Sequence, residues 1–246
     1  MANPGSRPAS GVAPGRLDGI ELLAGLTDDE VRALEQKCVW RIFRAGEQIF
    51  DRDSESRSIM FVVRGEVQVV NYSLSGREVA YAVVRAGGYF GELSAIDDEP
   101  RSASVVAIED CLLAALGSEI FNDILQRHAS VAVHVLRRLA RIIRNCDDRI
   151  MDLSTLGAMQ RVYRHLLRLA EPDPVSVGSW SIYPLPTQHS IAGEAGTTRE
   201  TVARAFSQLA AAGIVERKGR TLYIRDKNML ERLIARLGQG EEGSLQ

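Results

Sequence analysis

The chain has 246 residues, 45% of them hydrophobic and 25% charged, with a formal net charge of −2. This length suits two domains, and the charge gives no overall basicity that would indicate a nucleic-acid binder. No apolar run reaches the roughly 18 residues of a membrane span. The N-terminus lacks the charged start and apolar core of a signal peptide, so we expect a cytoplasmic protein.

The first residues are rich in Pro, Gly, Ser and Ala, and residues 1–20 are predicted to be a disordered tail. A helix is expected within 21–36, where Thr27 and Glu30 have the spacing of a capping box. Short apolar runs then alternate with glycine-containing turns, a pattern typical of an all-β sandwich or roll. These runs lie at 38–43, 48–50, 59–63, 66–71, 78–84, 103–108 and 111–116.

Residues 87–105 contain three glycines, an acid and an arginine, in what we expect to be a loop between two strands. Glycines let the backbone approach a ligand, and its N–H groups can cradle an anion. Arg101 can donate bidentate hydrogen bonds to phosphate oxygens. Glu92 suits a sugar hydroxyl, because a carboxylate only accepts hydrogen bonds. A phosphate clamp beside a hydroxyl clamp predicts a nucleotide site.

Enzymatic function is not expected. A cupin enzyme shares the β-rich architecture but needs histidine metal ligands on its strands, and no histidine precedes His128. The cysteines have no zinc-ligand spacing, so no metal site is predicted. No Ser/His/Asp triad or phosphate-binding P-loop is discernible.

Residues 118–155 are predicted to be helical. Apolar residues recur there at steps of four, three, four and seven, and Arg149 interrupts the stripe at the remaining position. A narrow apolar stripe fits a core helix or a dimer coiled coil. Because no second sheet follows to cover it, we favour a dimerisation helix at 129–156. The predicted stripe comprises Val135, Leu139, Ile142, Cys146 and Leu153.

Residues 157–237 are predicted to form a second domain, followed by a tail at 238–246. A helix is expected near 159–169 and a breaker-rich loop at 171–178. Within 187–209, a short helix, a turn with Gly196 and a helix capped at Thr197 or Thr198 have the helix-turn-helix pattern. A hairpin at 213–225, turning at Lys218-Gly219, adds a wing.

This second domain has the charge of a DNA binder. Residues 186–237 carry nine Lys/Arg and five Asp/Glu, a local net charge of +4 that leaves −6 for the rest of the chain. Arg199, Glu200 and Arg204 lie near the start of the recognition helix, where side chains reach base edges in the major groove. The expected phosphate contacts are Thr198, Thr201 and Gln188.

Two motifs resemble the cyclic-AMP receptor protein / fumarate–nitrate regulator superfamily of bacterial transcription factors. One is Phe-Gly-Glu-Leu, an acidic spacer and Pro-Arg-Ser-Ala within 87–105; the other is Arg-Glu-Thr-Val-x-Arg at 199–204. The resemblance implies an α+β chain: a jelly-roll-like, cyclic-nucleotide-binding β-roll at 21–128, a dimerisation helix and a C-terminal winged helix-turn-helix. It also implies a homodimer on palindromic double-stranded DNA with TGTGA- or TGTTA-like half-sites, and contact with RNA polymerase.

The resemblance also assigns ligand contacts. Glu92 corresponds to the family residue that binds the ribose 2′-hydroxyl, and Arg101, Ser102 and a backbone N–H correspond to those that bind the cyclic phosphate. Gly91 and Leu93 complete the matching cassette. By the same correspondence, Tyr81 and Ala82 lie beside the purine.

The family's Thr-Ser pair, which reads the adenine edge, is replaced here by Cys146 and Asp147, with Asn145 before them. Cysteine is a poor substitute for a hydroxyl. Asp147 could accept hydrogen bonds from guanine N1–H and N2–H₂, or it could be a solvated residue beside the stripe. Cyclic AMP is the ligand that the family suggests, and cyclic GMP stays open as the alternative.

Two other functions are alternatives to a cyclic-nucleotide-responsive transcription regulator. The same fold could sense another effector, but iron–sulfur relatives need several cysteines near the N-terminus, where only Cys38 occurs, and haem sensing would not require the Glu92/Arg101 pair. The β-domain could instead be a regulatory module without DNA binding. Such a module would accompany a catalytic domain or membrane spans, and neither is discernible in this sequence. The sequence leaves activation and repression open.

Overall fold

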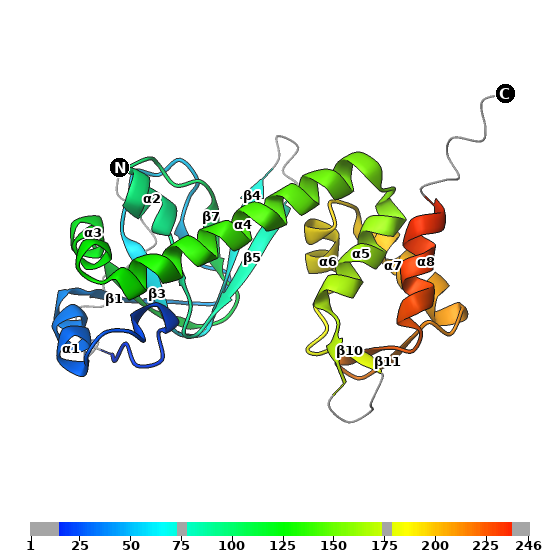
Figure 1. The fold of residues 1–246 in the computed structure, drawn as a ribbon, viewed down its shortest axis with the longest axis horizontal. Helices are drawn as coiled ribbons and strands as arrows, with labels where there is room; N and C mark the ends of the chain where they lie inside the picture. Colours follow the sequence, from blue (N-terminus) through cyan, green and yellow to red (C-terminus); the bar gives the residue numbers. More distant parts are fainter. Residues whose placement is uncertain (1–14, 73–77, 174–178, 238–246) are drawn as a thin grey trace. The chain divides into compact units, whose positions relative to one another are not determined.

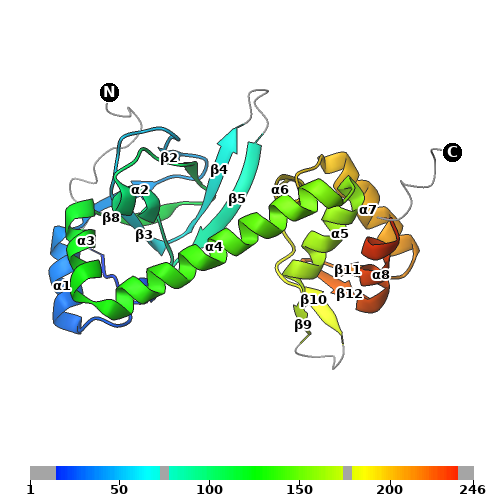
Figure 2. The same ribbon diagram turned by 45° about the horizontal axis from the view of Figure 1, so that its top comes forward.

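The computed structural model describes residues 15–72, 78–173 and 179–237. The chain divides into two compact units, residues 1–142 and 143–246, and helix α4 (Ala129–Thr155) contributes to both. Figures 1 and 2 show the helices and strands of each unit. Each unit has a core of its own and is described separately.

The first unit is the predicted β-roll. Two antiparallel four-stranded sheets have the orders β1-β8-β3-β6 and β2-β7-β4-β5. Side chains from both sheets, such as Phe43, Met60, Val67 and Leu113, form the core between them. The strands are β1 Val39–Phe43, β2 Gln48–Phe50, β3 Ile59–Arg64, β4 Glu66–Tyr72, β5 Glu78–Arg85, β6 Tyr89–Phe90, β7 Ser104–Ala107 and β8 Cys111–Leu116.

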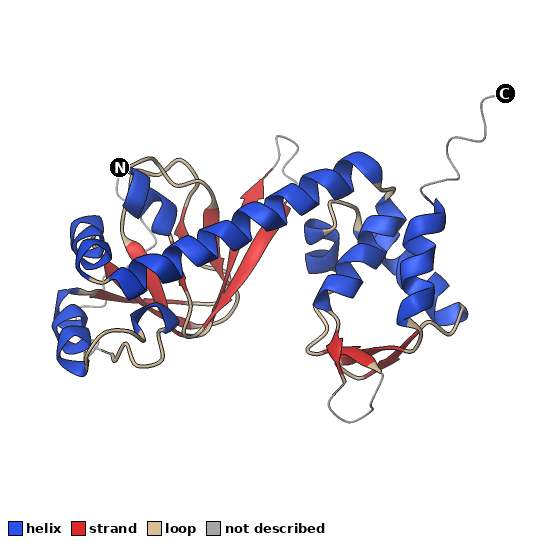
Figure 3. Cartoon of the chain, viewed as in Figure 1, coloured by secondary structure: helices blue, strands red, loops and turns tan. Residues whose placement is uncertain are grey.

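Helices cover the outer face of the β1-β8-β3-β6 sheet. A second core joins Phe61 and Leu116 of this sheet to Phe121, Val131 and Val135 of the helices. The helices of this unit are η1 Glu21–Leu23, α1 Asp28–Lys37, α2 Glu92–Asp97, α3 Ser118–Arg127 and the first part of α4. Figure 3 distinguishes the helices from the strands by colour.

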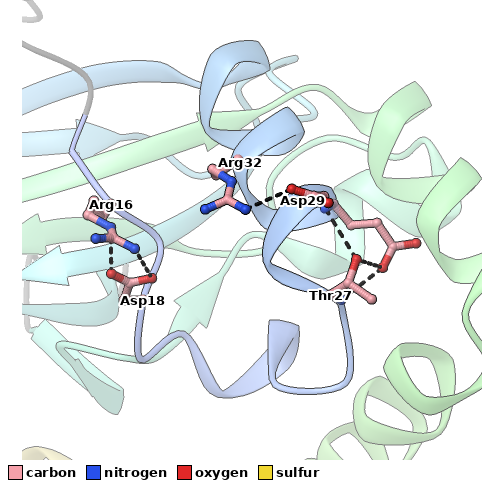
Figure 4. A network of polar contacts seen from close by, with 6 residues as sticks. Arg16, Asp18, Thr27, Asp29 and Arg32 are labelled. Atoms are coloured by element: carbon pink, nitrogen blue, oxygen red, sulfur yellow. Dashed lines mark hydrogen bonds and ion pairs between the residues drawn. The ribbon is translucent and has the colours of Figure 1, made fainter.

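The structure corrects the predicted boundary of the N-terminal tail. We predicted a tail to residue 20, but Leu17 and Ile20 are 1% and 3% exposed and belong to the core. The capping box predicted at Thr27 is confirmed, with its side chain accepting from the Glu30 N–H. Figure 4 shows Thr27 near Asp29, which pairs with Arg32.

The second unit is a winged helix-turn-helix. Its helices are the end of α4, α5 Ala158–Leu169, α6 Gln188–Glu194, α7 Arg199–Ala211 and α8 Lys227–Leu237. Its sheet has the order β11-β12-β10-β9, with β9 Glu171–Pro172, β10 Trp180–Ile182, β11 Val215–Lys218 and β12 Thr221–Ile224. Residues such as Leu166, Ile191, Val202 and Leu230 pack its core.

Two strands of this unit were not predicted. Residues 171–178 were expected to be a loop, but Glu171 and Pro172 pair with β10, which in turn pairs with β12 of the wing. Residues 174–178 lie outside the described part of the chain. Strands of two or three residues are too short to show a period-2 pattern, which explains why the sequence did not reveal them.

The apolar stripe on α4 differs from the prediction by one residue. Val135 is 3% exposed and packs in the core of the first unit. Leu136, Ile143 and Ile150 are 63%, 60% and 62% exposed and repeat every seven residues. They form the exposed stripe of α4, with Leu153 (50% exposed) and the exposed Cys146 at the intervening heptad positions. Arg149 therefore does not interrupt the stripe.

Candidate nucleotide site and DNA-binding surface

The cassette at 87–105 turns into a short helix where we expected only a loop. Gly91 adopts a left-handed conformation, with φ of 82°, and is the N-cap residue of α2. A Cβ at residue 91 would lie 2.5 Å from Arg101 Nη1 and 3.1 Å from Ser58 O. Glycine is therefore required here both for its backbone angle and for the space that the guanidinium occupies.

Arg101 is buried in the cassette, with 2% of its surface exposed. Its guanidinium donates to Ser56 Oγ at 3.0 Å, to Gly91 O at 2.9 Å and to Ser58 O at 2.6 Å. It also lies over the Phe50 ring, 4.2 Å from the centroid. Burial lowers the pKa of Arg101 to about 10, opposed by the Glu92 carboxylate, so the side chain stays charged at neutral pH.

These contacts define how Arg101 could hold a ligand. A guanidinium has five N–H donors, and three of them bond to Gly91 of the cassette and to Ser56 and Ser58 before β3. Two donors are left for an anion, and the exposed Ser102 lies next in the chain. The structure thus places Arg101 in contact with Gly91 and shows which groups hold the arginine in place; binding of a phosphate by Arg101 and Ser102 stays a prediction.

Glu92 is the first residue of α2 and is 5% exposed. Its charge partner is Arg138 of α4, whose Nε lies 3.7 Å from Glu92 Oε1. Arg138 also donates to Tyr89 O at 2.9 Å and lies over the Tyr89 ring. Sequence reasoning missed this residue, although Arg138 follows the buried Val135 by three positions and so lies on the same helix face.

The other predicted ligand residues lie on α2, β5 and α4. Leu93 is 38% exposed on α2. Tyr81 and Ala82 lie on β5, where Ala82 is exposed and pairs with Val69 of β4. The predicted base-reading residues Asn145, Cys146 and Asp147 are all exposed on the part of α4 that belongs to the second unit. Their contact with a purine stays a prediction.

The helix-turn-helix presents its recognition helix as predicted. Thr198 is the N-cap of α7, and its hydroxyl accepts from the Thr201 N–H at 3.3 Å. Arg199, Glu200 and Arg204 are exposed near the start of the helix. Hydrogen bonds from the backbone and from Thr198 lower the pKa of Glu200, so it is ionised at neutral pH.

The phosphate contacts need one revision. Thr201 is 6% exposed and accepts a hydrogen bond from Arg204 Nη2 at 3.3 Å. Its place inside the helix-turn-helix favours a structural role over the phosphate contact that we expected. Thr198 is exposed and Gln188 is half-buried at the start of α6. The wing adds the exposed basic residues Arg217 and Arg220, which the sequence reasoning had not singled out.

Comparison with known proteins supports both predicted domains. Residues 40–128 match the family model of the cyclic nucleotide-binding domain, and residues 160–233 match that of the Crp-like helix-turn-helix domain. The Cyclic AMP receptor protein of Thermus thermophilus is 32% identical over 217 residues, which cover 88% of this chain and 98% of that protein. The chain belongs to the cyclic AMP receptor protein family of transcription regulators.

Other relatives fit this family. The CRP-like cAMP-activated global transcriptional regulator of Mycobacterium tuberculosis is 25% identical over 86% of this chain and 95% of its own length. The structure of FixK2 from Bradyrhizobium japonicum aligns with a TM-score of 0.63 and 26% identity, covering 80% of this chain and 96% of that one. Members of the cyclic AMP receptor protein family are transcription regulators rather than enzymes.

A further solved structure shares only the fold with this chain. CprK complexed with OCPA aligns with a TM-score of 0.69 at 17% identity, which shows a shared fold only. The match to the cyclic nucleotide-binding domain and the cassette contacts are what indicate a nucleotide. Among residues 15–72, 78–173 and 179–237, no cluster of metal-ligating side chains occurs, and no helix is long and apolar enough to cross a membrane.

Proposed function

We propose that this protein is a cytoplasmic, homodimeric transcription regulator that binds a palindromic DNA site in response to a 3′,5′-cyclic nucleotide. The observation that carries the proposal is the cassette. Arg101 is held by three hydrogen bonds and keeps two donors for a phosphate, and the Glu92 carboxylate lies in the same cassette. A cyclic nucleotide offers a phosphate for the arginine and a 2′-hydroxyl for the carboxylate.

Cyclic AMP is the effector that we favour. Relatives from Thermus thermophilus and Mycobacterium tuberculosis are named as a cyclic AMP receptor and as cAMP-activated. Asp147 supports the alternative, since an exposed carboxylate can accept two hydrogen bonds from guanine. The proposed assignment gives the ribose to Glu92, the phosphate to Arg101 and Ser102, and the base to the region of Asn145, Cys146 and Asp147 with Tyr81 and Ala82.

Dimer formation is supported by the exposed stripe of α4. Leu136, Ile143 and Ile150 repeat every seven residues, as the contact positions of a two-stranded coiled coil do. Pairing these helices would remove three large aliphatic side chains from water. Full burial of each side chain would stabilise the dimer by about 1.5–3 kcal/mol. A twofold dimer would present two recognition helices, which matches a palindrome with TGTGA- or TGTTA-like half-sites.

The recognition helix supplies the base contacts in this proposal. Arg199 and Arg204 are suited to guanine O6 and N7, and Glu200 to cytosine N4. The nucleotide then acts as a switch, because a ligand shifts an equilibrium between two states by its differential affinity for them. A shift from about 1:99 to 99:1 needs roughly 5.5 kcal/mol of preference. RNA polymerase is the expected partner at the promoter.

Titration calorimetry on the full chain tests this function. We expect cyclic AMP or cyclic GMP to bind with one site per protomer, and adenosine 5′-monophosphate, which lacks the cyclic phosphate, to bind far more weakly. Similar heats for the cyclic and the open nucleotide would contradict the assignment of Arg101 and Glu92 as a cyclic-nucleotide clamp.

A further inference from the structure

A polar cavity lies inside the DNA-binding unit, where the end of α4 meets α5 and α6. Its volume is about 20 Å³, enough for about one water molecule. Six charged or titratable side chains line it. They are Arg149 and Asp152 of α4, Arg161, His165 and Arg168 of α5, and Glu194 of α6.

His165 and Glu194 face each other across this cavity. His165 is 9% exposed, and its Nε2 has no hydrogen-bond partner. That nitrogen lies 3.6 Å from Glu194 Oε2, just beyond hydrogen-bonding distance. The other carboxylate oxygen of Glu194 accepts from Ser190 Oγ at 3.2 Å. A buried acceptor or donor without a partner is costly, so a proton between these two groups would satisfy both.

The surrounding charges decide where that proton sits. Arg168 lies 2.8 Å from Asp152, and Arg161 donates to the backbone oxygens of Ala195 and Gly196. Burial, together with the positive charges of Arg168 and Arg149, lowers the pKa of His165 to about 4.

The pKa of the Glu194 carboxyl shifts in the opposite direction. Burial raises the pKa of Glu194, opposed by the Ser190 hydrogen bond and by Arg149. Both effects favour a neutral imidazole facing a protonated carboxyl.

We propose that Glu194 and His165 hold one proton between them and that this proton fastens α6 to α5. The Glu194 carboxyl carries the proton and donates it to the lone pair on Nε2 of the neutral His165. As pH rises the proton leaves to water, and a carboxylate then faces that lone pair. The contact is therefore present at lower pH and lost as pH rises through the raised pKa of Glu194.

The position of this pair links it to DNA binding. Glu194 is the last residue of α6, and the turn that follows leads to Thr198, the N-cap of α7. Loosening α6 from α5 would therefore loosen the recognition helix. We expect DNA affinity to fall as pH rises, by at most about tenfold per pH unit for each bound protomer, the limit for one linked proton. This readout rests on the proposed function.

The test is the dissociation constant of the full chain for a palindromic duplex, with saturating cyclic AMP, between about pH 5.5 and about pH 8.5. Glu194→Gln keeps a donor toward Nε2 but has no proton to lose, so its affinity should lack the pH dependence of the parent. Glu231→Gln is the matched control, because it removes one carboxylate from the exposed face of α8. It should keep the parent's slope. A parent slope in Glu194→Gln would overturn the proposal.

A second measurement needs neither DNA nor a variant. Long-range ¹H–¹⁵N spectra of the histidine rings should show His165 neutral over the same pH range, with its shifts following the titration of Glu194. Protonation of His165 near the ordinary histidine pKa of about 6.5 would overturn the proposal. If DNA binding is absent at every pH, the proposed function fails while these spectra still decide the proton site.

Discussion

Replacing Arg101 by leucine should affect stability as well as ligand binding. The guanidinium hydrogen-bonds two backbone carbonyls, Gly91 O and Ser58 O, and one hydroxyl, Ser56 Oγ. Leucine offers no donor, and each buried polar group left unpaired costs about 1–3 kcal/mol. The two carbonyls alone give roughly 2–6 kcal/mol, against a typical total stability of about 5–15 kcal/mol.

The assay combines urea unfolding with calorimetry on the full chain. We expect Arg101→Leu to lower the free energy of unfolding by about 2–6 kcal/mol and to abolish measurable binding of cyclic AMP. Ser102→Ala is the control, because Ser102 is exposed and follows the same arginine. It should weaken the nucleotide modestly, by about 1 kcal/mol, and leave stability unchanged. Parent stability in Arg101→Leu would refute the structural role, and parent affinity would refute the clamp.

Three further predictions concern α4 and α7. Ile143→Asp should place a charge in the exposed stripe and shift the protein to monomers in sedimentation; an unchanged dimer would contradict a coiled-coil contact there. Arg199→Ala should cost about 1–3 kcal/mol at the cognate DNA site, whereas Glu200→Ala should mainly relax base selectivity; equal losses on cognate and random duplex in anisotropy would argue against α7 as the reader. Asp147→Ala should weaken cyclic GMP more than cyclic AMP in calorimetry if Asp147 reads guanine, and equal effects would make it a solvated residue.

The sequence predicted the fold well wherever patterns were long or motifs specific. The β-roll, the long helix and the winged helix-turn-helix are all present, with the capping residues at Thr27 and Thr198. Periodicity over many residues and short-range capping signals can both be recognised in a single sequence. The cassette motif placed Gly91 and Arg101 in one short segment, and the structure shows the two in contact.

What the sequence could not provide were contacts between distant segments. Arg138 meets Glu92 from 46 positions away, and nothing local signals that pairing. On α4, Val135 and Leu136 are neighbouring aliphatic residues, so the pattern could not decide which one faces the core. Such one-residue ambiguity rotates the stripe by about 100°, enough to exchange a buried face for an exposed one.

The most direct test of the account is the affinity of the full chain for a palindromic duplex, measured by fluorescence anisotropy with and without cyclic AMP or cyclic GMP at one fixed salt concentration. Salt must be fixed because phosphate contacts make the affinity depend on it. We predict that one of the two nucleotides tightens binding by about 5- to 150-fold, the usual range of coupling between two sites. Equal affinity with and without either nucleotide, in a protein that binds both nucleotide and DNA, would contradict a cyclic-nucleotide-responsive regulator.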